Sequence, residues 1–265
     1  MNKYSCLLVG LGKIGMTYDL DSINKNTFFT HAKAINNHPN FELTGVVDSN
    51  KERRYLFSKH YKSQVFDSIK SSVKNNKYSI VIIAVPTDHH FKTVNQVLEN
   101  LKPKIILCEK PLAYNLKEAT SIVSICKKFD VKLFLNYFRR SDPSVIEIKA
   151  QINTLENNSI KGVCWYNKGL IHSCTHFIDL CEFWMGPLEK IRLISKKKRF
   201  GLKDYSIDFN IKYKKGEITF LSHEKYFSNF SVELNSSVGR IVYDYEGYSI
   251  YWNRIIKNNS IDNFY

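Results

Sequence analysis

The sequence predicts an α/β fold with a doubly wound parallel sheet, followed by an α+β domain with a mostly antiparallel, open sheet. An apolar strand at residues 4–9 runs into the glycine loop Gly10–Gly15, and short buried strands then alternate with helices. Longer strands with alternating polarity follow residue 138. We therefore place a Rossmann-type dinucleotide-binding domain at residues 1–137 and a substrate-binding and oligomerisation domain at 138–265.

The glycine loop has the pattern G-x-G-x-x-G directly after a strand. Gly10 permits the tight turn, Gly12 removes a side chain where the backbone approaches a pyrophosphate, and Gly15 lets the next segment pack closely. A second apolar strand, residues 41–47, ends in Asp48, whose carboxylate suits a ribose diol. These features predict a dinucleotide site.

Residues 16–28, rich in Asp and Asn, separate the glycine loop from the first helix. We expect them to form an inserted loop near the cofactor. Helical periodicity resumes at 29–35, with Thr30 as the N-cap and Pro39 just past the end.

The elements that follow alternate as a parallel sheet requires. Helices are expected at 51–60, 68–75, 89–101 and 116–129, and strands at 65–66, 79–85, 104–108 and 132–136. These short strands are continuously apolar, which is typical of strands buried on both faces.

The second domain has helices expected at 143–155 and 174–185, and Trp184 on the apolar side of the latter is expected in the core. Hairpin signals at 214–217 and 246–247 favour antiparallel pairing of these strands. The active site is expected between the two domains. Strands are expected at 160–168, 189–196, 205–214, 217–223, 230–236, 240–245 and 248–252.

The net charge of +14 has three possible explanations. The favoured one is a compositional excess of solvent-exposed lysines, because the lysines are scattered along the sequence. A field that attracts an anionic small substrate stays open. Nucleic acid is not expected, because no motif supports it. The dense run at 196–199 is expected to be a solvated turn between strands.

Several classes of protein are disfavoured. No apolar run reaches the roughly 18 residues that span a bilayer, and the N-terminus looks like a strand rather than a signal peptide. Six cysteines without a C-x-x-C pair predict reduced thiols and a cytoplasmic protein, with disulfides or zinc as the minor alternatives.

Four segments carry a family resemblance: the glycine loop with Asp48, Val-Pro-Thr-Asp-His-His at 85–90, Cys-Glu-Lys-Pro-Leu-Ala at 108–113, and His-Ser-Cys-Thr-His-Phe-Ile-Asp at 172–179. In order and spacing they resemble the Gfo/Idh/MocA oxidoreductases, which include glucose-fructose oxidoreductase and inositol dehydrogenase. Glu-Lys-Pro at the end of a buried strand is the most specific element. The resemblance covers most of the chain.

The resemblance implies an NAD(P)-dependent oxidoreductase that transfers a hydride at a carbinol carbon of a sugar, polyol or nucleotide sugar. Lys110 would be the acid/base and alkoxide stabiliser, His176 would share the proton transfer, and His172 would touch substrate. The strand ends support this, because ligands of open parallel sheets bind at the carboxyl ends, where Asp48, Glu109-Lys110 and Asn136 fall.

The cofactor-binding residues expected are Gly10, Gly12, Lys13, Ile14, Gly15, Asp48, Pro86, Thr87, His90, Glu109 and Lys110. The substrate-binding residues expected are Lys110, Arg139, Tyr166, His172, His176 and Asp179. Asp179 is expected to orient the imidazole of His176. For Arg139 and Arg140, ligand binding and an interdomain salt bridge are equally open.

Some features leave alternatives open. Asp48 favours NAD, while Arg53 and Arg54 keep NADP as the alternative. Many relatives carry Asp where this chain has His172, which puts an inositol dehydrogenase mechanism in doubt. No metal site is expected, because neither a third ligand nor a cysteine pair accompanies His172 and His176.

Gly-x-x-Tyr-Asp at 15–19 and the segment 168–172 look like the branch of surface-polysaccharide sugar synthesis, which favours a nucleotide-linked sugar. An NAD-dependent glycosidase of the same fold and a non-catalytic dinucleotide sensor or partner subunit remain alternatives. The chain stops shortly after a strand, where relatives are commonly longer. We expect a homodimer or homotetramer through the second sheet, and no membrane partner.

Overall fold

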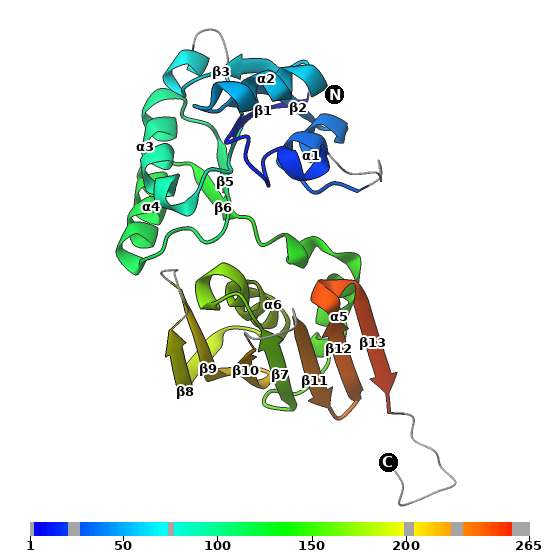
Figure 1. The fold of residues 1–265 in the computed structure, drawn as a ribbon. Coiled ribbons are helices and arrows are strands. Elements are labelled where there is room, and N and C mark those ends of the chain that lie inside the picture. The colour runs from blue at the N-terminus through cyan, green and yellow to red at the C-terminus, as the bar shows by residue number, and fades with distance from the viewer. Residues whose placement is uncertain (1–2, 21–26, 74–76, 199–203, 224–229, 256–265) are drawn as a thin grey trace, which may run out of the picture. The chain divides into compact units, whose positions relative to one another are not determined.

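The computed structural model describes residues 3–20, 27–73, 77–198, 204–223 and 230–255 (Figure 1). Contacts divide the chain into two compact units, Met1–Asn136 and Tyr137–Tyr265. Each unit is described by itself.

The first unit contains a six-stranded parallel sheet in the order β3-β2-β1-β4-β5-β6. This is the doubly wound order, with the reversal at β1 and β4. The strands are β1 (Tyr4–Val9), β2 (Phe41–Val47), β3 (Gln64–Phe66), β4 (Ile80–Ile83), β5 (Ile105–Cys108) and β6 (Lys132–Leu135). The helices are α1 (His31–Asn37), α2 (Lys51–His60), α3 (His90–Asn100) and α4 (Leu116–Lys128).

Helices cover both faces of this sheet. Along β1, Cys6 and Leu8 pack with residues of α1 and α2, whereas Leu7 and Val9 pack with residues of α3 and α4. Alternate residues of one strand therefore enter two separate cores, which explains why the strand sequence is apolar throughout.

The helix starts follow local chemistry. Thr30 accepts a hydrogen bond from the backbone N–H of Lys33, which confirms the predicted N-cap of α1. Asn50 and Asn115 cap α2 and α4 in the same way. Within the expected inserted loop, Asp19 accepts from the backbone N–H of Phe29; residues 21–26 lie outside the described part.

The second unit contains a seven-stranded sheet in the order β13-β12-β11-β7-β10-β9-β8. Its strands are β7 (Ile160–Tyr166), β8 (Leu188–Lys198), β9 (Tyr205–Tyr213), β10 (Gly216–Ser222), β11 (Ser231–Ser236), β12 (Gly239–Asp244) and β13 (Ser249–Arg254), and its helices are α5 (Pro143–Asn153) and α6 (Thr175–Met185). Only the β7–β10 pair is parallel among the described pairs, so the predicted mostly antiparallel sheet is confirmed.

One face of this sheet carries α5 and α6, and a single apolar core joins them to it. Trp184 lies in that core as predicted, and its indole N–H donates to the carbonyl of Val145 at 3.0 Å. The expected hairpin at 214–217 joins β9 to β10, where Gly216 pairs with Tyr213.

Two sequence predictions about local structure are wrong. The expected turn at 196–199 is a strand as far as Lys198, which pairs with Tyr205; Arg199 lies outside the described residues. In the described part of the helix expected at 68–75, the structure has a short 3₁₀ turn, Lys70–Val73; residues 74 and 75 lie outside the described residues. There the hydroxyl of Ser71 donates to the carbonyl of Ser68, and such serine contacts compete with helix formation.

All six cysteines lie in described parts of the chain and are buried free thiols. Burial raises the pKa of Cys6 and of Cys126 to about 11, which disfavours their thiolates. Among the described residues, no helix combines the length and apolarity needed to cross a bilayer.

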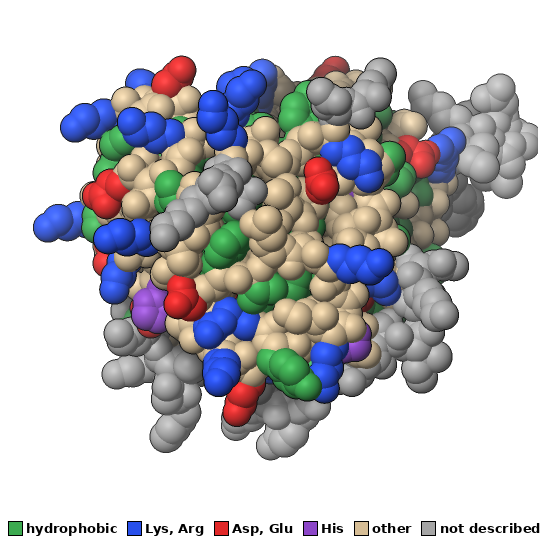
Figure 2. Space-filling model, turned by 90° about the horizontal axis from the view of Figure 1, so that it is seen from above, with side chains coloured by type: hydrophobic (Ala, Val, Ile, Leu, Met, Phe, Trp, Pro, Cys, Tyr) green, Lys and Arg blue, Asp and Glu red, His purple; other side chains and the backbone are tan. Residues whose placement is uncertain are grey.

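On the face that Figure 2 shows, the described lysines and arginines lie at several places among acidic and other side chains and do not form one continuous patch. This arrangement agrees with the reading of the +14 charge as a solvated bias.

Candidate functional site

The three glycines of the loop after β1 have different surroundings. An added Cβ at Gly10, where φ is +103°, would lie 2.5 Å from the carbonyl oxygen of Ala84, and one at Gly15 would lie 2.1 Å from that of Gly10. At Gly12 the nearest atom is Nη1 of Arg53, at 3.9 Å. The fold therefore requires Gly10 and Gly15, whereas Gly12 leaves open a space that a pyrophosphate would occupy.

Asp48 lies at the end of β2 and faces the glycine loop. Its Oδ2 accepts from the backbone N–H of Leu11 at 2.7 Å, and its Oδ1 accepts from that of Asn50 at 2.8 Å. The residue is only 8% exposed. Each carboxylate oxygen keeps a second lone pair, so Asp48 can also accept from ribose hydroxyls.

The two arginines near Asp48 differ in their contacts. Nη1 of Arg53 lies 3.8 Å from Oδ2 of Asp48, whereas Nη1 of Arg54 donates to the carbonyls of Asp48 and Ser49 at 2.8 and 2.9 Å. Arg54 is thus held on the backbone, and Arg53 is the arginine beside the carboxylate.

Glu109, at the end of β5, joins three elements. Its Oε1 lies 2.7 Å from Nε2 of His31 on α1 and accepts from Nδ2 of Asn136, after β6, at 2.7 Å. Burial alone would raise the pKa of Glu109, but His31, Asn136 and Lys110 together lower it below its ordinary value. Glu109 is therefore held as a carboxylate beside Lys110.

His90 begins α3 and is 1% exposed. Its Nδ1 lies 3.1 Å from the carbonyl of Leu112 and its Nε2 lies 3.0 Å from that of Val85. The ring thus links the loop after β5 to the end of β4. The contact with the cofactor that was expected for His90 stays a prediction.

The second unit carries His172 in a π-turn, Leu170–Cys174, and His176 in the first turn of α6. The His176 ring packs edge-on against Tyr137 and Phe138, with ring centroids 5.7 and 5.6 Å away. The two histidines lie on consecutive turns, as their spacing predicts.

Asp179 binds Arg140. Its Oδ2 accepts from Nε of Arg140 at 2.7 Å, and its Oδ1 accepts from Nη2 at 2.5 Å. Burial raises the pKa of Asp179 even though the Arg140 charge opposes that rise. Arg140 thus forms a salt bridge within the second unit. The expectation that Asp179 orients His176 stays a prediction.

Two further residues expected to bind substrate are engaged inside the second unit. Nη1 of Arg139 donates to the hydroxyl of Tyr243 at 3.0 Å, and Nη2 lies 3.2 Å from Oε2 of Glu246. Tyr166 is fully buried, and its hydroxyl donates to the carbonyl of Ile207 at 2.5 Å. These contacts give Arg139 and Tyr166 a structural role. That either residue also contacts the substrate stays a prediction.

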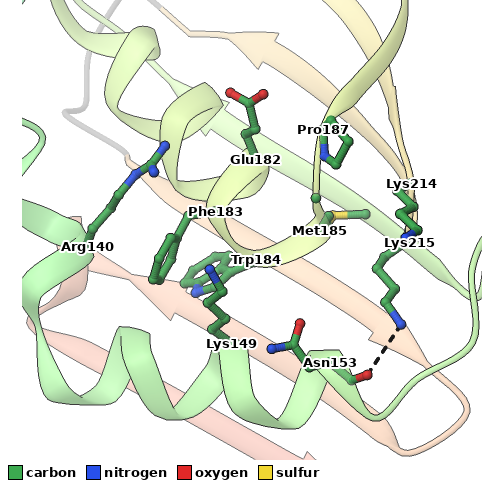
Figure 3. Close-up of a pocket in the computed structure, with 11 residues that line it drawn as sticks. Arg140, Lys149, Asn153, Glu182, Phe183, Trp184, Met185, Pro187, Lys214 and Lys215 are labelled. Carbon is green, nitrogen blue, oxygen red and sulfur yellow. Dashed lines mark hydrogen bonds between the residues drawn. The ribbon is translucent and has the colours of Figure 1, made fainter.

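A cavity of about 610 Å³ opens in the second unit where α5 and α6 end (Figure 3). Lys149 and Arg140 stand over the ring of Phe183 at 3.7 and 5.2 Å, and Lys215 donates to the carbonyls of Asn153 and Leu155. Lys215 thus lies at the C-terminal end of α5, where a cation stabilises the helix dipole, and Arg140 is held by Asp179. His172 and His176 do not line this cavity.

Metal ligands do not gather in the described parts of the chain: no three His, Cys, Asp or Glu side chains form a cluster there. A dinucleotide, in contrast, fits the residues present, because the space at Gly12 and the remaining acceptor capacity of Asp48 lie at the end of the first strands.

Comparison with known proteins gives a consistent picture. Residues 4–137, half of the chain, match the model of an oxidoreductase family with an NAD-binding Rossmann fold. Inositol 2-dehydrogenase of Rubrobacter xylanophilus is 29% identical over 115 residues, 43% of this chain and 33% of that protein. Glucose-6-phosphate 3-dehydrogenase of Bacillus subtilis is 28% identical over 133 residues, 50% of this chain and 37% of that protein. The matches thus span little more than a third of these relatives.

Solved structures share the fold over nearly the whole chain. The WlbA dehydrogenase from Bordetella pertussis, in complex with NADH and UDP-GlcNAcA, has a TM-score of 0.78 at 16% identity and covers 98% of this chain and 80% of that one. A myo-inositol dehydrogenase assigned in Sinorhizobium meliloti has a TM-score of 0.71 at 18% identity, over 91% of this chain and 75% of that one. At these identities the likeness establishes the two-domain architecture.

Proposed function

Since this chain belongs to the Gfo/Idh/MocA oxidoreductase family, we propose that it is an NAD(P)-dependent dehydrogenase or reductase of a sugar or polyol. It would transfer a hydride to or from a carbinol carbon. The observation that carries the proposal is the glycine loop, where a Cβ added at Gly12 would approach only Nη1 of Arg53, at 3.9 Å, and that Nη1 lies 3.8 Å from the Asp48 carboxylate.

Gly10, Gly12, Lys13, Ile14 and Gly15 would hold the pyrophosphate, and Asp48 the ribose hydroxyls. When bound, the nicotinamide supplies the hydride acceptor or donor. NAD is preferred because the Asp48 carboxylate repels a 2′-phosphate. Arg53 lies 3.8 Å from that carboxylate and is the residue that would bind the 2′-phosphate if NADP were the cofactor.

Lys110 is proposed to take up the hydroxyl proton as the hydride leaves, or to return it in the reverse direction. An ammonium group there also stabilises the alkoxide that precedes a carbonyl. The adjacent Glu109 supports the stabilising role, because its carboxylate, whose pKa is lowered, keeps a negative charge beside the ammonium group. His176 would share the proton transfer, and His172 would contact the substrate.

A nucleotide-linked sugar in surface-polysaccharide synthesis is the substrate that we propose. The segments at 15–19 and 168–172 support this choice, and the structurally similar WlbA dehydrogenase was solved with UDP-GlcNAcA.

We also propose a homodimer or homotetramer formed through the second sheet. Trp165 supports it: this side chain of the central strand β7 is 40% exposed, while its neighbours Cys164 and Tyr166 are fully buried on the helix side. The six buried free thiols support a reducing compartment, the cytoplasm.

The test begins with the purified protein. Any released nicotinamide is identified by mass after denaturation, NAD(H) and NADP(H) are titrated by fluorescence, and nucleotide sugars are then screened for reduced cofactor. We expect tight NAD binding and turnover of a nucleotide sugar. Binding of neither dinucleotide would rule out the oxidoreductase, and sugar cleavage without net NADH would identify a glycosidase instead.

Lys110→Met then tests the catalytic lysine. We expect turnover to be lost while the dinucleotide Kd changes by no more than a few fold. Lys104→Met, the same change at an exposed lysine before β5, is the matched control. Turnover retained in Lys110→Met would remove Lys110 from the mechanism.

A further inference from the structure

We infer that Asp204 is a positioning residue that fixes the π-turn carrying His172. Asp204 lies just before β9, outside every segment that carries the family resemblance. The inference rests on the proposed function in one respect: His172 and His176 are taken to face the substrate.

The Asp204 carboxylate accepts three backbone N–H groups. Its Oδ1 accepts from Ile171 at 3.0 Å and from Tyr205 at 2.7 Å, and its Oδ2 accepts from His172 at 2.9 Å. The residue is only 6% exposed. Hydrogen bonds to a carboxylate are about twice as strong as neutral ones, so this group holds the turn firmly from a distant strand.

The π-turn needs such an acceptor. Its own hydrogen bonds run from the N–H groups of Ser173 and Cys174 to the carbonyl of Gly169, at 3.3 and 3.2 Å. The N–H groups of Ile171 and His172 precede these bonds and point out of the start of the turn, where a helix leaves its donors without carbonyl partners. Asp204 therefore acts as an N-cap supplied from another part of the chain.

Gly169 makes room for the carboxylate. Its φ is +84°, and an added Cβ would lie 2.3 Å from Oδ2 of Asp204. Lys168 before it also has a positive φ, +59°. The backbone at 168–169 is thus shaped to bring the turn onto Asp204.

Tyr166 makes a second attachment to the same stretch of β9. Its hydroxyl donates to the carbonyl of Ile207 at 2.5 Å and accepts from the N–H of Ile207 at 2.9 Å. The start of β9 is therefore bound both to the end of β7 and to the π-turn. Together, Asp204 and Tyr166 connect a rigid sheet to the backbone of His172.

The contacts of Asp204 should affect the turnover of substrate and leave dinucleotide binding unchanged. The backbone of His172 sets where its imidazole projects, and the hydroxyl of Thr175 donates to the carbonyl of Ile171, which links the turn to the start of α6 and His176. A loosened turn would misplace both rings. Catalytic groups displaced by about 1 Å lose rates of the order of 10²-fold.

The first test reads the turn directly, without activity. Amide hydrogen exchange at Ile171 and His172 is measured in wild type, Asp204→Asn and Asp208→Asn. Asp208 is the matched control, because it lies four residues further along and accepts from Ser222 and Ser195 instead. We expect exchange to rise by at least about tenfold, the equivalent of 1.4 kcal/mol, in Asp204→Asn alone. Unchanged exchange would overturn the inference.

The second test separates positioning from general stability. In Asp204→Asn we expect kcat/KM for the sugar substrate to fall by about 10²-fold, while the dinucleotide Kd and the activity of Asp208→Asn stay at wild-type values. Faster exchange with unchanged kinetics would overturn the positioning role. A wild type that turns over no sugar would refute the proposed function, and the exchange measurement would still decide the role of Asp204.

Gly169→Ala gives an independent variant in case Asp204→Asn fails to fold. The added methyl group displaces the carboxylate while the charge remains. We expect the same rise in exchange at Ile171 and His172, and no rise would contradict the inference.

Discussion

Glu109 links more of the candidate cofactor site than any other side chain described above. It joins His31 at the start of α1, Asn136 after β6 and, through the chain, Lys110. Since its pKa is lowered, its ionised form stabilises the folded state. The carboxylate thus serves both stability and the electrostatics beside the lysine.

A pH dependence follows from the direction of this shift. The unfolded chain binds a proton at Glu109 near the ordinary pKa of 4.5, and the folded chain binds it only at lower pH. Its stabilising contribution is therefore complete above that value and is lost as the pH falls through the folded-state pKa. We expect the free energy of unfolding to fall less steeply below pH 4.5 in Glu109→Gln than in wild type, measured by urea denaturation.

Glu99→Gln is the control for this measurement, because Glu99 is an exposed glutamate on α3. It should follow the wild-type curve. Identical acid slopes for wild type and Glu109→Gln would show that the contacts of Glu109 with His31 and Asn136 do not stabilise the fold.

Asp48→Ala tests the ribose contact. We expect NAD binding to weaken by about 1–3 kcal/mol, the cost of a lost hydrogen bond to a charged group. Isothermal titration gives the Kd, and Asp67→Ala, an exposed aspartate after the neighbouring strand β3, is the control. Equal NAD affinity in wild type and Asp48→Ala would remove Asp48 from the site.

The sequence predicted part of this site at the residue level. Local motifs and strand ends mark Gly10–Gly15, Asp48 and Glu109, and the structure places Asp48 against the glycine loop, while their part in cofactor binding stays a prediction. His31 and Asp204 were missed, because their partners Glu109 and His172 are far away in the chain. The one local signal for His31 was its place directly after the N-cap Thr30, at a helix start.

At the scale of elements, the glycine loop contains one glycine that the fold needs, Gly15, and one that the ligand would need, Gly12. An added Cβ at Gly15 meets backbone at 2.1 Å, whereas one at Gly12 meets only the end of a flexible arginine at 3.9 Å. We expect Gly12→Ala to keep its melting temperature but to lose dinucleotide affinity about tenfold or more, since the methyl group occupies the pyrophosphate space. Thermal unfolding and fluorescence titration measure the two effects.

Gly15→Ala is the comparison variant, and we expect it to have a lower melting temperature than wild type. If Gly12→Ala destabilised the fold as much as Gly15→Ala, or bound NAD normally, the assignment of Gly12 to the pyrophosphate would be wrong.

Elements were predicted well where local chemistry decides them. The N-cap at Thr30, the hairpin at 214–217 and the alternation of strands are set by neighbouring residues. The strand at 196–198 was missed because long-range pairing with β9 overrides the preference of consecutive lysines for turns. The expected helix at 68–75 was wrong because serine side chains compete for its backbone groups.

At the scale of the whole molecule, the face of the second sheet opposite α5 and α6 bears on assembly. Trp165→Arg places a charge on the central strand of that face, and we expect the oligomer to dissociate into monomers, measured by light scattering after size exclusion. Leu116→Arg is the control, because Leu116 is 82% exposed and lies on α4 of the first unit. An oligomer that persists in Trp165→Arg would place the subunit contact elsewhere.

The central position of β7 governs when the second unit acquires its structure during synthesis. Ile160 cannot pair before Gly216 of β10 has been synthesised, and Trp165 cannot pair before Ser231 of β11 has been, whereas the last strand of the first unit ends already at Leu135. Translation therefore completes a folded dinucleotide unit while β7 still has two open edges, the state in which strands pair wrongly. We therefore expect nascent chains that end near residue 200 to aggregate more readily than the complete chain.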